Sequence, residues 1–385
     1  MTTEVQHQTT QRRADLLFDW DRLPLVSPDL PGTGGVIRVE PDDFQVEEIP
    51  AYLPSGAGAH TYLKVHKRGA TTRDVVLALV GAGVAEKRIG VAGLKDKSAV
   101  TVQWLSLPAS EEAAVAALAD LPGVTVLESS RHTNKLGMGH LRGNRFTIRV
   151  RGVVPDAASR ARAIVDRLAV VGAPNWFGPQ RFGRFGSNAW DGWRIVTGES
   201  VHGAHRLKRF FVSSLQSLLF NRLLAHRLES GTYTRLIDGD WARKHDTGGT
   251  FLVDDGTFES PRAERLEISA TIPLYGRKVK VSPAAAGELE TRALDDLGLS
   301  WQHFTSRRGD RRITRLALAN VEVIPAGEDL ILSFALPKGS YATALLREIM
   351  KVDVDQPTVW AGASADPASG AASDHDDVDD DDELD

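Results

Sequence analysis

The spacing of hydrophobic and polar positions predicts alternating strands and helices over the first half of the chain. Strands are expected where apolar and polar side chains alternate, and helices where apolar side chains recur every three or four positions. Alternation predicts short strands at residues 36–39, 44–46, 100–105 and 146–150. Helical spacing predicts helices at residues 71–84, with Thr72 as N-cap, at 111–121 and at 157–171. This half of the chain therefore mixes both kinds of element.

The pattern changes after a long helix predicted at residues 207–229, which Gly231 ends. Short strands and Gly/Asp turns follow, then a helix at 283–297, before strand alternation returns at 321–324 and 330–334. We therefore expect a second unit between roughly 201 and 315. The length of 385 residues agrees, because a single core usually stops growing at about 250–300 residues.

Composition narrows the class of protein. The chain is 42% hydrophobic, which is enough for ordinary cores, but no stretch approaches the ~18 apolar residues that cross a bilayer. The N-terminus is polar, without the apolar centre of a signal peptide, so we expect a soluble, cytoplasmic protein. The absence of cysteine excludes disulfides, thiolate nucleophiles and cysteine-based zinc sites.

Charge is distributed unevenly. The net charge is −5, but residues 374–385 contain nine acids, so the remainder carries +4. Such a block has too little apolar surface to fold and is expected to be a disordered tail, joined by an Ala/Ser/Gly/Pro linker at 361–373. The tail is read as a solubilising appendage, with competition for the protein's own basic surface as the alternative. Residues 1–31 are expected to be a loosely packed lead-in.

Two runs of basic residues suggest contacts with phosphate. The first, between Arg131 and Arg151, contains six cations and no acid; the second, from Arg307 to Arg315, contains five arginines and one acid. Basic patches attract polyanions and give salt-sensitive affinity. A charge run is more often only a solvated face, but two runs flanking the second unit would be suited to line a cleft between domains.

The strongest candidate for chemistry is Asp96, in the segment from Val91 to Trp104 (VAGLKDKSAVTVQW). It lies between Lys95 and Lys97, and nearby cations favour the ionised carboxylate. An anion of this kind is usable as a nucleophile or a base. A solvated charged turn is the plainer alternative.

This segment resembles the signature of the TruD family of pseudouridine synthases. Further blocks match that family in the same order, at residues 41–48 (PDDFQVEE), 132–146 (HTNKLGMGHLRGNRF), 175–184 (NWFGPQRFGR) and 336–348 (LPKGSYATALLRE). The resemblance extends from about residue 32 to residue 349.

The resemblance implies an α+β catalytic domain of the pseudouridine-synthase type, with a largely antiparallel sheet and flanking helices. This domain would be split into residues 32–200 and 316–360 by an inserted family-specific α/β domain at 201–315. The implied substrate is a uridine of tRNA, at position 13 in the D arm, isomerised to pseudouridine without cofactor or metal. The implied partner is tRNA alone, with no membrane and no obligate protein partner, and the protein is expected to be a monomer.

The resemblance also implies site residues. Asp96 would be the catalytic carboxylate, acting on the ribose either by attacking C1′ or by removing a proton from C2′. A flipped uracil needs an aromatic face and hydrogen bonds at its edge. The implied uracil-binding residues are Arg38, Phe44, Asn175, Phe177 and Tyr341. The expected phosphate contacts are Lys95, Lys97, Arg142, Arg145, Arg181 and Arg184.

Several of these residues have plainer interpretations. Phe44 and Phe177 could be ordinary core aromatics, and Asn175 could be a turn former. Tyr341 stands where family members often have phenylalanine, and its hydroxyl needs a partner. Arg38 stands near the position of a common lysine, and the two cations are not equivalent.

Two other functions are alternatives. A catalytically silent RNA-binding or RNA-folding protein would share the fold, although it would have no physical need for an acid between two lysines. A metal-dependent hydrolase is disfavoured, because His202 and His205 are separated by Gly203 and no paired carboxylate motif accompanies them.

Overall fold

The computed structural model describes residues 10–354, so the predicted linker and acidic tail lie outside the described residues. The described chain divides into two compact units. One, here called the sheet unit, contains residues 33–161 and 319–340. The other, the helical unit, contains residues 10–32, 162–318 and 341–354. These boundaries differ from those of the predicted catalytic and inserted domains.

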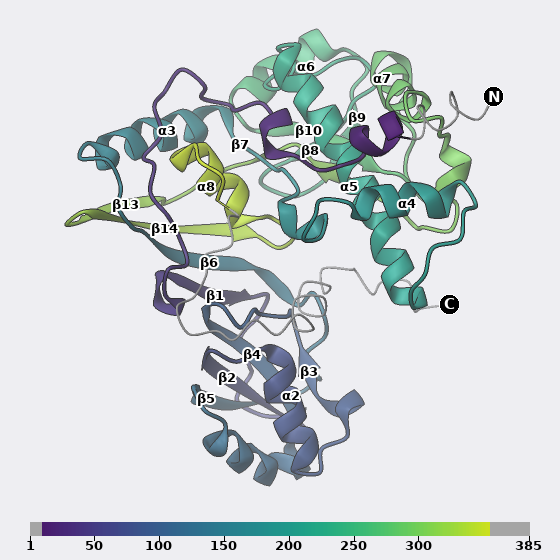
Figure 1. Ribbon diagram of the computed structural model, residues 1–385. Coiled ribbons are helices and arrows are strands. Elements are labelled where there is room, and N and C mark those ends of the chain that lie inside the picture. Colours follow the sequence, from purple (N-terminus) through teal and green to yellow (C-terminus); the bar gives the residue numbers. More distant parts are fainter. Residues whose placement is uncertain (1–9, 355–385) are drawn as a thin grey trace. The chain divides into compact units, whose positions relative to one another are not determined.

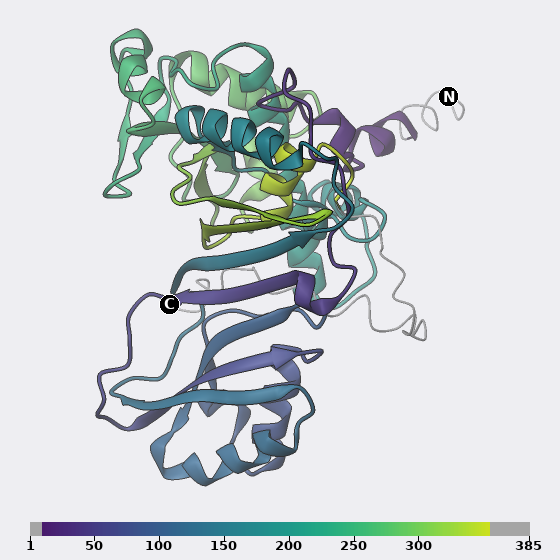
Figure 2. The ribbon, with the colours of Figure 1, turned by 90° about the vertical axis from the view of Figure 1, so that its left-hand side faces the viewer.

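The sheet unit is built on one eight-stranded sheet. Its strands run in the order β13-β14-β6-β1-β4-β2-β5, with β3 beside β4 (Figure 2). Every neighbouring pair is antiparallel except β1 and β4, which are parallel. The strands are β1 (Phe44–Pro50), β2 (His60–Arg68), β3 (Gly90–Val91), β4 (Val100–Pro108), β5 (Val124–His132), β6 (Leu141–Val150), β13 (Glu322–Ala326) and β14 (Asp329–Pro337).

Helix α2 (Thr72–Gly81) packs on one part of this sheet (Figure 1). Its N-cap is Thr71, one residue before the predicted cap, and Thr71 and Asp74 form a reciprocal capping box. Val75 and Leu79 are fully buried in a core shared with β2 and β4. A hydrophobic stripe at helical spacing therefore fixes α2 against the sheet, as the sequence predicts.

Three 3₁₀ helices also belong to the sheet unit: η2 (Pro41–Asp43), η3 (Glu86–Arg88) and η4 (Ala109–Asp120). The predicted helix at 111–121 thus exists as η4, with 3₁₀ rather than α geometry. Alanine is common along it, and Leu118 is its one buried residue. The predicted strand at 36–39 is reduced to a single bridge between Val36 and Arg151.

The helical unit contains α5 (His205–Glu229), a long helix with buried side chains over most of its length. The boundary between the units falls within α3 (Ala157–Val171), a helix whose bounds match the prediction. The unit also contains α4 (Asn188–Val196), α6 (Gly256–Glu264), α7 (Ala284–Asp295) and α8 (Ala342–Met350), and residues 10–15 are helical as well. The shorter 3₁₀ helices are η1 (Trp20–Arg22), η5 (Pro179–Arg181) and η6 (Trp301–Phe304).

Two small sheets accompany these helices. The first has the order β11-β10-β8-β9, and the second pairs β12 with β7. Their strands are β7 (Ala173–Pro174), β8 (Trp241–Lys244), β9 (Thr250–Leu252), β10 (Ile268–Leu274), β11 (Asp310–Ile313) and β12 (Arg315–Leu316). Arg315 is buried among them, and its guanidinium donates to the carbonyl oxygens of Val171, Ala263 and Ile268.

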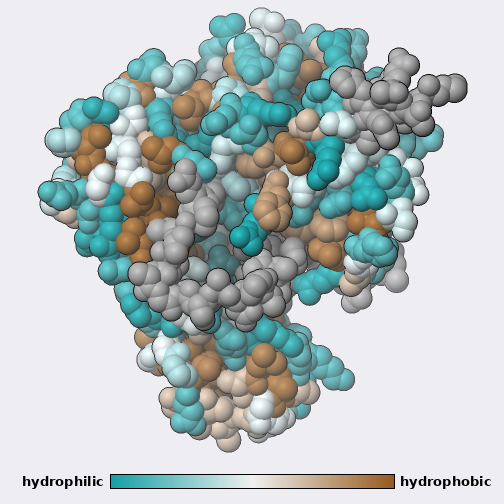
Figure 3. Space-filling model, viewed as in Figure 1, coloured by the Kyte–Doolittle hydropathy of each residue, from teal (hydrophilic) through white to brown (hydrophobic). Residues whose placement is uncertain are grey.

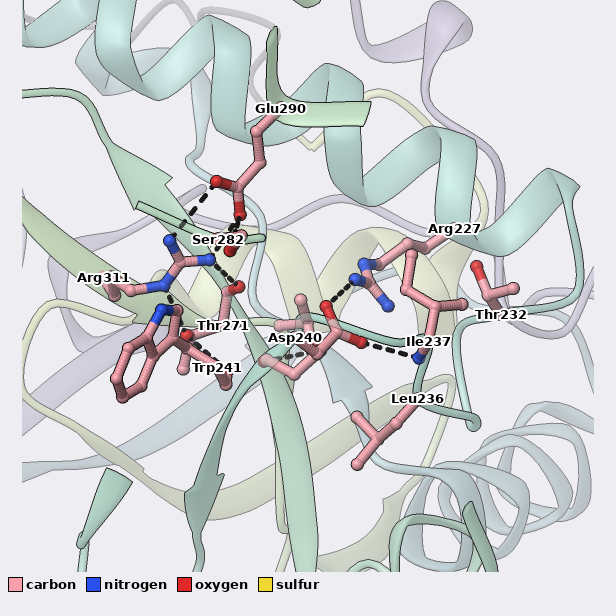
Figure 4. A network of polar contacts seen from close by, with 12 residues as sticks. Arg227, Thr232, Leu236, Ile237, Asp240, Trp241, Thr271, Ser282, Glu290 and Arg311 are labelled. Carbon is pink, nitrogen blue, oxygen red and sulfur yellow. Dashed lines mark hydrogen bonds and ion pairs between the residues drawn. The ribbon is translucent and has the colours of Figure 1, made fainter. Parts of the chain in front are cut away.

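Buried polar groups also join α5 and α7 to these strands (Figure 4). Arg311 of β11 pairs with Glu290 of α7, while Arg227 of α5 pairs with Asp240. Ser282 donates to the same Glu290 carboxylate at 2.8 Å. These arginines support the packing of the helical unit, because each buried charge has an opposite charge beside it.

No helix within residues 10–354 combines the length and the hydrophobicity that a membrane span requires. On the face shown in Figure 3, hydrophobic residues lie in small separate groups among hydrophilic ones.

Candidate functional site

Asp96 is exposed on the loop between β3 and β4, and hydrogen bonds anchor the backbone of this loop. The Lys95 N–H donates to Thr72 Oγ1 at 2.8 Å, and the Thr72 hydroxyl donates to Gln103 Oε1 at 2.7 Å. The Gln103 amide donates to the Gly93 carbonyl at 3.1 Å. The loop is therefore held by the start of α2 and by β4, which fixes the backbone that carries the carboxylate.

Buried charges lie next to this loop. Lys95 Nζ donates to Asn144 Oδ1 at 2.6 Å and lies 3.8 Å from Glu48 Oε2. Lys67 is fully buried, with its Nζ 3.5 Å from both the Ala70 carbonyl and Thr72 Oγ1. The predicted role of Lys95 as a phosphate contact thus competes with these internal bonds.

The cluster shifts two pKa values. Burial and the Lys95 cation lower the pKa of Lys67 to about 7, and the Asp96 carboxylate acts in the opposite direction. Burial raises the pKa of Glu48, although Lys95 opposes that shift. Asp96 is therefore electrostatically coupled to an internal lysine as well as adjacent to Lys95 and Lys97 in sequence.

The structure brings Arg38 and Phe44 together at the start of β1. The Arg38 guanidinium lies 4.4 Å from the centre of the Phe44 ring, and Phe44 is buried. Gln45 of β1 is paired with Val100 of β4 in the parallel ladder. Because parallel strands begin at the same edge, Phe44 and the loop that leads from Asp96 into β4 share one edge of the sheet.

Asn175, Phe177 and Tyr341 form a second group, in the helical unit. Asn175 Oδ1 accepts a hydrogen bond from Arg312 at 2.5 Å, and Asn175 Nδ2 donates to the Ile313 carbonyl at 2.9 Å. The Arg312 guanidinium lies 4.0 Å from the centre of the Phe177 ring, and Tyr341 meets that ring edge-on at 5.9 Å. Both ends of the Asn175 amide are thus bonded within the protein.

Helix α5 fixes the position of Phe177. The Phe177 backbone N–H donates to Asn221 Oδ1 at 2.9 Å, and Asn221 Nδ2 donates to the Phe177 carbonyl at 3.0 Å. The next residue, Gly178, has no room for a side chain, since an added Cβ would lie 2.8 Å from Thr343 Oγ1. Phe177 is 5% exposed and belongs to the hydrophobic core, as its plainer interpretation predicts.

The predicted phosphate contacts differ in exposure. Lys97, Arg142, Arg145 and Arg184 are exposed. Arg145 lies 3.5 Å from Glu47, whereas Arg181 is half-buried and donates to Ser217 Oγ at 3.2 Å.

Acids distant in the sequence neutralise much of the first basic run, and burial removes part of the second. In the first, Arg131 pairs with Glu112, Arg149 with Asp329 and Arg151 with Asp43. In the second, Arg311 and Arg315 are buried, so these two do not line a surface as the sequence suggests. The absence of acids within a run does not reveal acidic partners on other elements of the fold.

Sequence reasoning missed Lys67 and the role of Arg312. Lys67 lies on β2, a strand that alternation does not predict. Arg312 stands out in the sequence only as one charge of a run, but its contacts are with Asn175 and Phe177, far earlier in the chain. Neither the burial of Lys67 nor the contacts of Arg312 can be read from the residues next to them in the sequence.

Comparisons with known proteins identify the family of the chain. The family model described as tRNA pseudouridine synthase D (TruD) matches residues 24–200 and 199–349. The chain belongs to the TruD family of tRNA pseudouridine synthases. This confirms the family and the enzyme class predicted from the sequence.

Relatives in the TruD family are similar over nearly their whole length. The chain is 53% identical to tRNA pseudouridine synthase D of a Thermus thermophilus strain, over 88% of this chain and 95% of the relative. It is 47% identical to the protein of the same name from Anaeromyxobacter dehalogenans, over 87% of this chain and 98% of the relative.

A solved structure extends the comparison to the fold. A crystal structure from Methanosarcina mazei, described as a candidate tRNA pseudouridine synthase D (TruD), matches with a TM-score of 0.68 and 26% identity. The match covers 86% of this chain and 97% of that one. The predicted fold class, mixed α and β with a largely antiparallel sheet, is confirmed.

Proposed function

We propose that this protein isomerises uridine to pseudouridine in tRNA, at position 13 of the D arm, and that Asp96 carries the chemistry. Membership of the TruD family supports the reaction and the tRNA substrate. The choice of nucleotide follows the resemblance of the sequence motifs. A cytoplasmic, monomeric enzyme without a protein partner is part of the same proposal.

The reaction breaks the bond between ribose C1′ and uracil N1, rotates the base and joins its C5 to C1′. The proton on C5 is lost and N1 gains a proton. The atoms of substrate and product are the same, so the protein has to supply only positioning and acid–base or nucleophilic chemistry. An exposed carboxylate suits this task, acting either on C1′ as a nucleophile or on the C2′ hydrogen as a base. The anchored loop of Asp96 supports this role, since it fixes the backbone from which the side chain projects.

The remaining predicted site residues are proposed to bind the flipped uridine. Phe44 with Arg38 would offer an apolar and cationic surface at the sheet edge where the Asp96 loop enters β4. Asn175, Phe177 and Tyr341 are proposed on the resemblance of their motifs. For Asn175 to bind uracil, the edge of the base has to displace Arg312 from Asn175 Oδ1 or form a second hydrogen bond to the amide while Arg312 stays in place. The division into a split catalytic domain and an inserted domain at residues 201–315 stays part of the proposal.

The decisive experiment is incubation of the protein with transcribed tRNA, followed by mapping of pseudouridine. The wild type is expected to modify one D-arm uridine. Asp96→Asn should abolish product while leaving the Kd for tRNA within a few-fold of wild type, because it keeps the shape of the side chain. Asp254→Asn, at another exposed aspartate, is the matched control.

Two outcomes would overturn the proposal. Wild-type protein that binds tRNA but leaves every uridine unchanged would favour a silent RNA-binding protein. Unchanged turnover by Asp96→Asn would remove the catalytic assignment of this aspartate.

A further inference from the structure

Phe185 is unusually exposed for an aromatic residue. Its exposed fraction is 79%, the highest among the large hydrophobic side chains of residues 10–354. It follows a block with three other aromatic residues, Trp176, Phe177 and Phe182, all of them buried. Single exposed hydrophobic residues are common, so exposure alone assigns no role to this ring.

The turn that carries Phe185 is anchored at both ends. Phe182 is fully buried and stacks on Phe18, with ring centres 4.3 Å apart. The Phe18 N–H donates to the Gly186 carbonyl and the Gly186 N–H donates to the Gly183 carbonyl, both at 2.9 Å. Between these anchors, Arg184 and Phe185 face the solvent.

Two glycines make this turn possible. Gly183 has φ +76° and Gly186 has φ +67°, values that favour glycine. An added Cβ at Gly186 would also lie 2.8 Å from the Phe18 carbonyl oxygen. The backbone of the turn is therefore fixed, which lowers the ordering cost of a contact between Phe185 and a ligand.

One arginine lies beside the ring. The Arg184 guanidinium lies 5.5 Å from the centre of the Phe185 ring. An aromatic face beside an arginine is the combination that binds single-stranded nucleic acid, with the base on the ring and the phosphate near the cation.

We propose that Phe185 is a stacking platform for an unpaired base of the RNA substrate, and that Arg184 contacts the adjoining phosphate. This inference rests on the proposed function, because it takes RNA as the ligand. Phe177, in the predicted uridine site, is 5% exposed and has Arg312 against its ring, whereas Phe185 is open to a base without rearrangement of the core. It therefore contributes affinity for a nucleotide other than the one that reacts.

The test is the Kd for transcribed tRNA, measured with Phe185→Ala, Phe185→Leu and Phe185→Trp. Loss of base stacking should weaken binding by roughly 5- to 150-fold in the alanine variant. Leucine should recover little, because it lacks a π-face, while tryptophan should bind close to wild type. Phe258→Ala is the matched control, since Phe258 is 76% exposed in the same unit. Melting temperatures report whether each variant remains folded.

Salt dependence separates the two residues. Phe185→Ala should weaken binding by the same factor at every salt concentration. Arg184→Gln should reduce the slope of log Kd against log salt by about 0.7–0.9, the value for one phosphate contact. The inference is overturned if folded Phe185→Ala binds tRNA as tightly as wild type, or if leucine restores affinity fully.

Failure of this inference is distinguishable from failure of the proposed function. Wild-type protein that forms pseudouridine while Phe185→Ala binds normally would overturn only the stacking role. Protein that binds tRNA through Phe185 but forms no pseudouridine would overturn only the catalytic proposal.

Discussion

Lys95 Nζ lies 3.8 Å from the carboxylate of Glu48, and both side chains are almost completely withdrawn from solvent. Lys95 directly precedes Asp96, so the same short segment supplies an internal cation and an exposed anion. A buried charge that loses its partner is strongly destabilising, whereas replacing both charges by apolar groups is often tolerated. The pair is therefore expected to couple the folding of the sheet unit to the position of the Asp96 loop.

Removing the Lys95 cation should destabilise the protein. Lys95→Met is expected to lower the free energy of unfolding by ~3–5 kcal/mol, since Glu48 remains buried without it. The double variant Lys95→Met/Glu48→Met should recover much of that loss. Lys64→Met, which removes a more exposed partner of Glu47, should cost ~0–1 kcal/mol. Denaturant unfolding measures all three; equal losses in the two single variants would contradict the role of burial.

The buried Lys67 should make stability depend on pH. Its pKa is about 7 in the folded protein against an ordinary value of 10.5, so the unfolded chain binds more protons between these values. The free energy of unfolding should therefore rise with pH across this window, by at most ~1.4 kcal/mol per pH unit from this group. Below pH 7 the lysine is protonated in both states, so its contribution to the pH dependence ends there.

The measurement is the difference in unfolding free energy between wild type and Lys67→Met at pH 7, 8 and 9. Parallel curves for the two proteins would show that Lys67 does not titrate in this range. Asp96→Asn should lower the pKa of Lys67 further, because the Asp96 carboxylate favours the charged lysine. The rise should then begin at a lower pH than in wild type.

Phe177→Ala should lower the stability of the protein, and this loss would obscure any effect of the variant on substrate binding. The ring is 5% exposed and packs edge-on against Phe220 with centres 5.4 Å apart, so truncation leaves a cavity that costs ~3–5 kcal/mol. Phe177→Leu retains most of the volume and is the better variant for turnover. Equal melting temperatures for Phe177→Ala and wild type, measured by calorimetry, would contradict this expectation.

Arg142 and Arg151 should behave differently although both belong to the first basic run. Arg142 is exposed, and Arg142→Gln should reduce the salt slope of tRNA binding by about 0.7–0.9 with no change in melting temperature. Arg151 donates to the buried Asp43 carboxylate at 2.8 Å, so Arg151→Gln should lower the melting temperature instead. Melting and tRNA-binding curves for both variants check this. A lower melting temperature for Arg142→Gln with none for Arg151→Gln would contradict the assignment of Arg142 to binding and Arg151 to stability.

The periodicity of hydrophobic residues correctly predicts elements that bury one face and expose the other. The helix at 157–171 has the predicted bounds, and α5 begins two residues before the predicted start. Strands β2 and β5 escape prediction, because β2 buries the polar residues Thr61 and Lys67 and only the first residue of β5 is buried. The pairing of β14 with β6 places Leu330 opposite Val150, a relationship between distant segments that no local pattern indicates.

For the site, motif resemblance is more informative than local chemistry. It singles out Arg38 and Phe44, which the structure brings into contact. The engagement of Asn175 by Arg312 depends on β11, a strand reached only after the chain has passed through α5, α6 and α7. Contacts of this kind arise from tertiary folding and leave no mark on either segment alone.

The pairing of β6 with β14 also has a consequence for biosynthesis. Until residue 337 leaves the ribosome, β6 can pair only with β1. The backbone groups along its other edge have no partner until β14 is synthesised. Exposed edges of this kind promote association between nascent chains. We therefore expect translation to pass through a stage, between residues 150 and 337, in which chaperones protect the growing polypeptide.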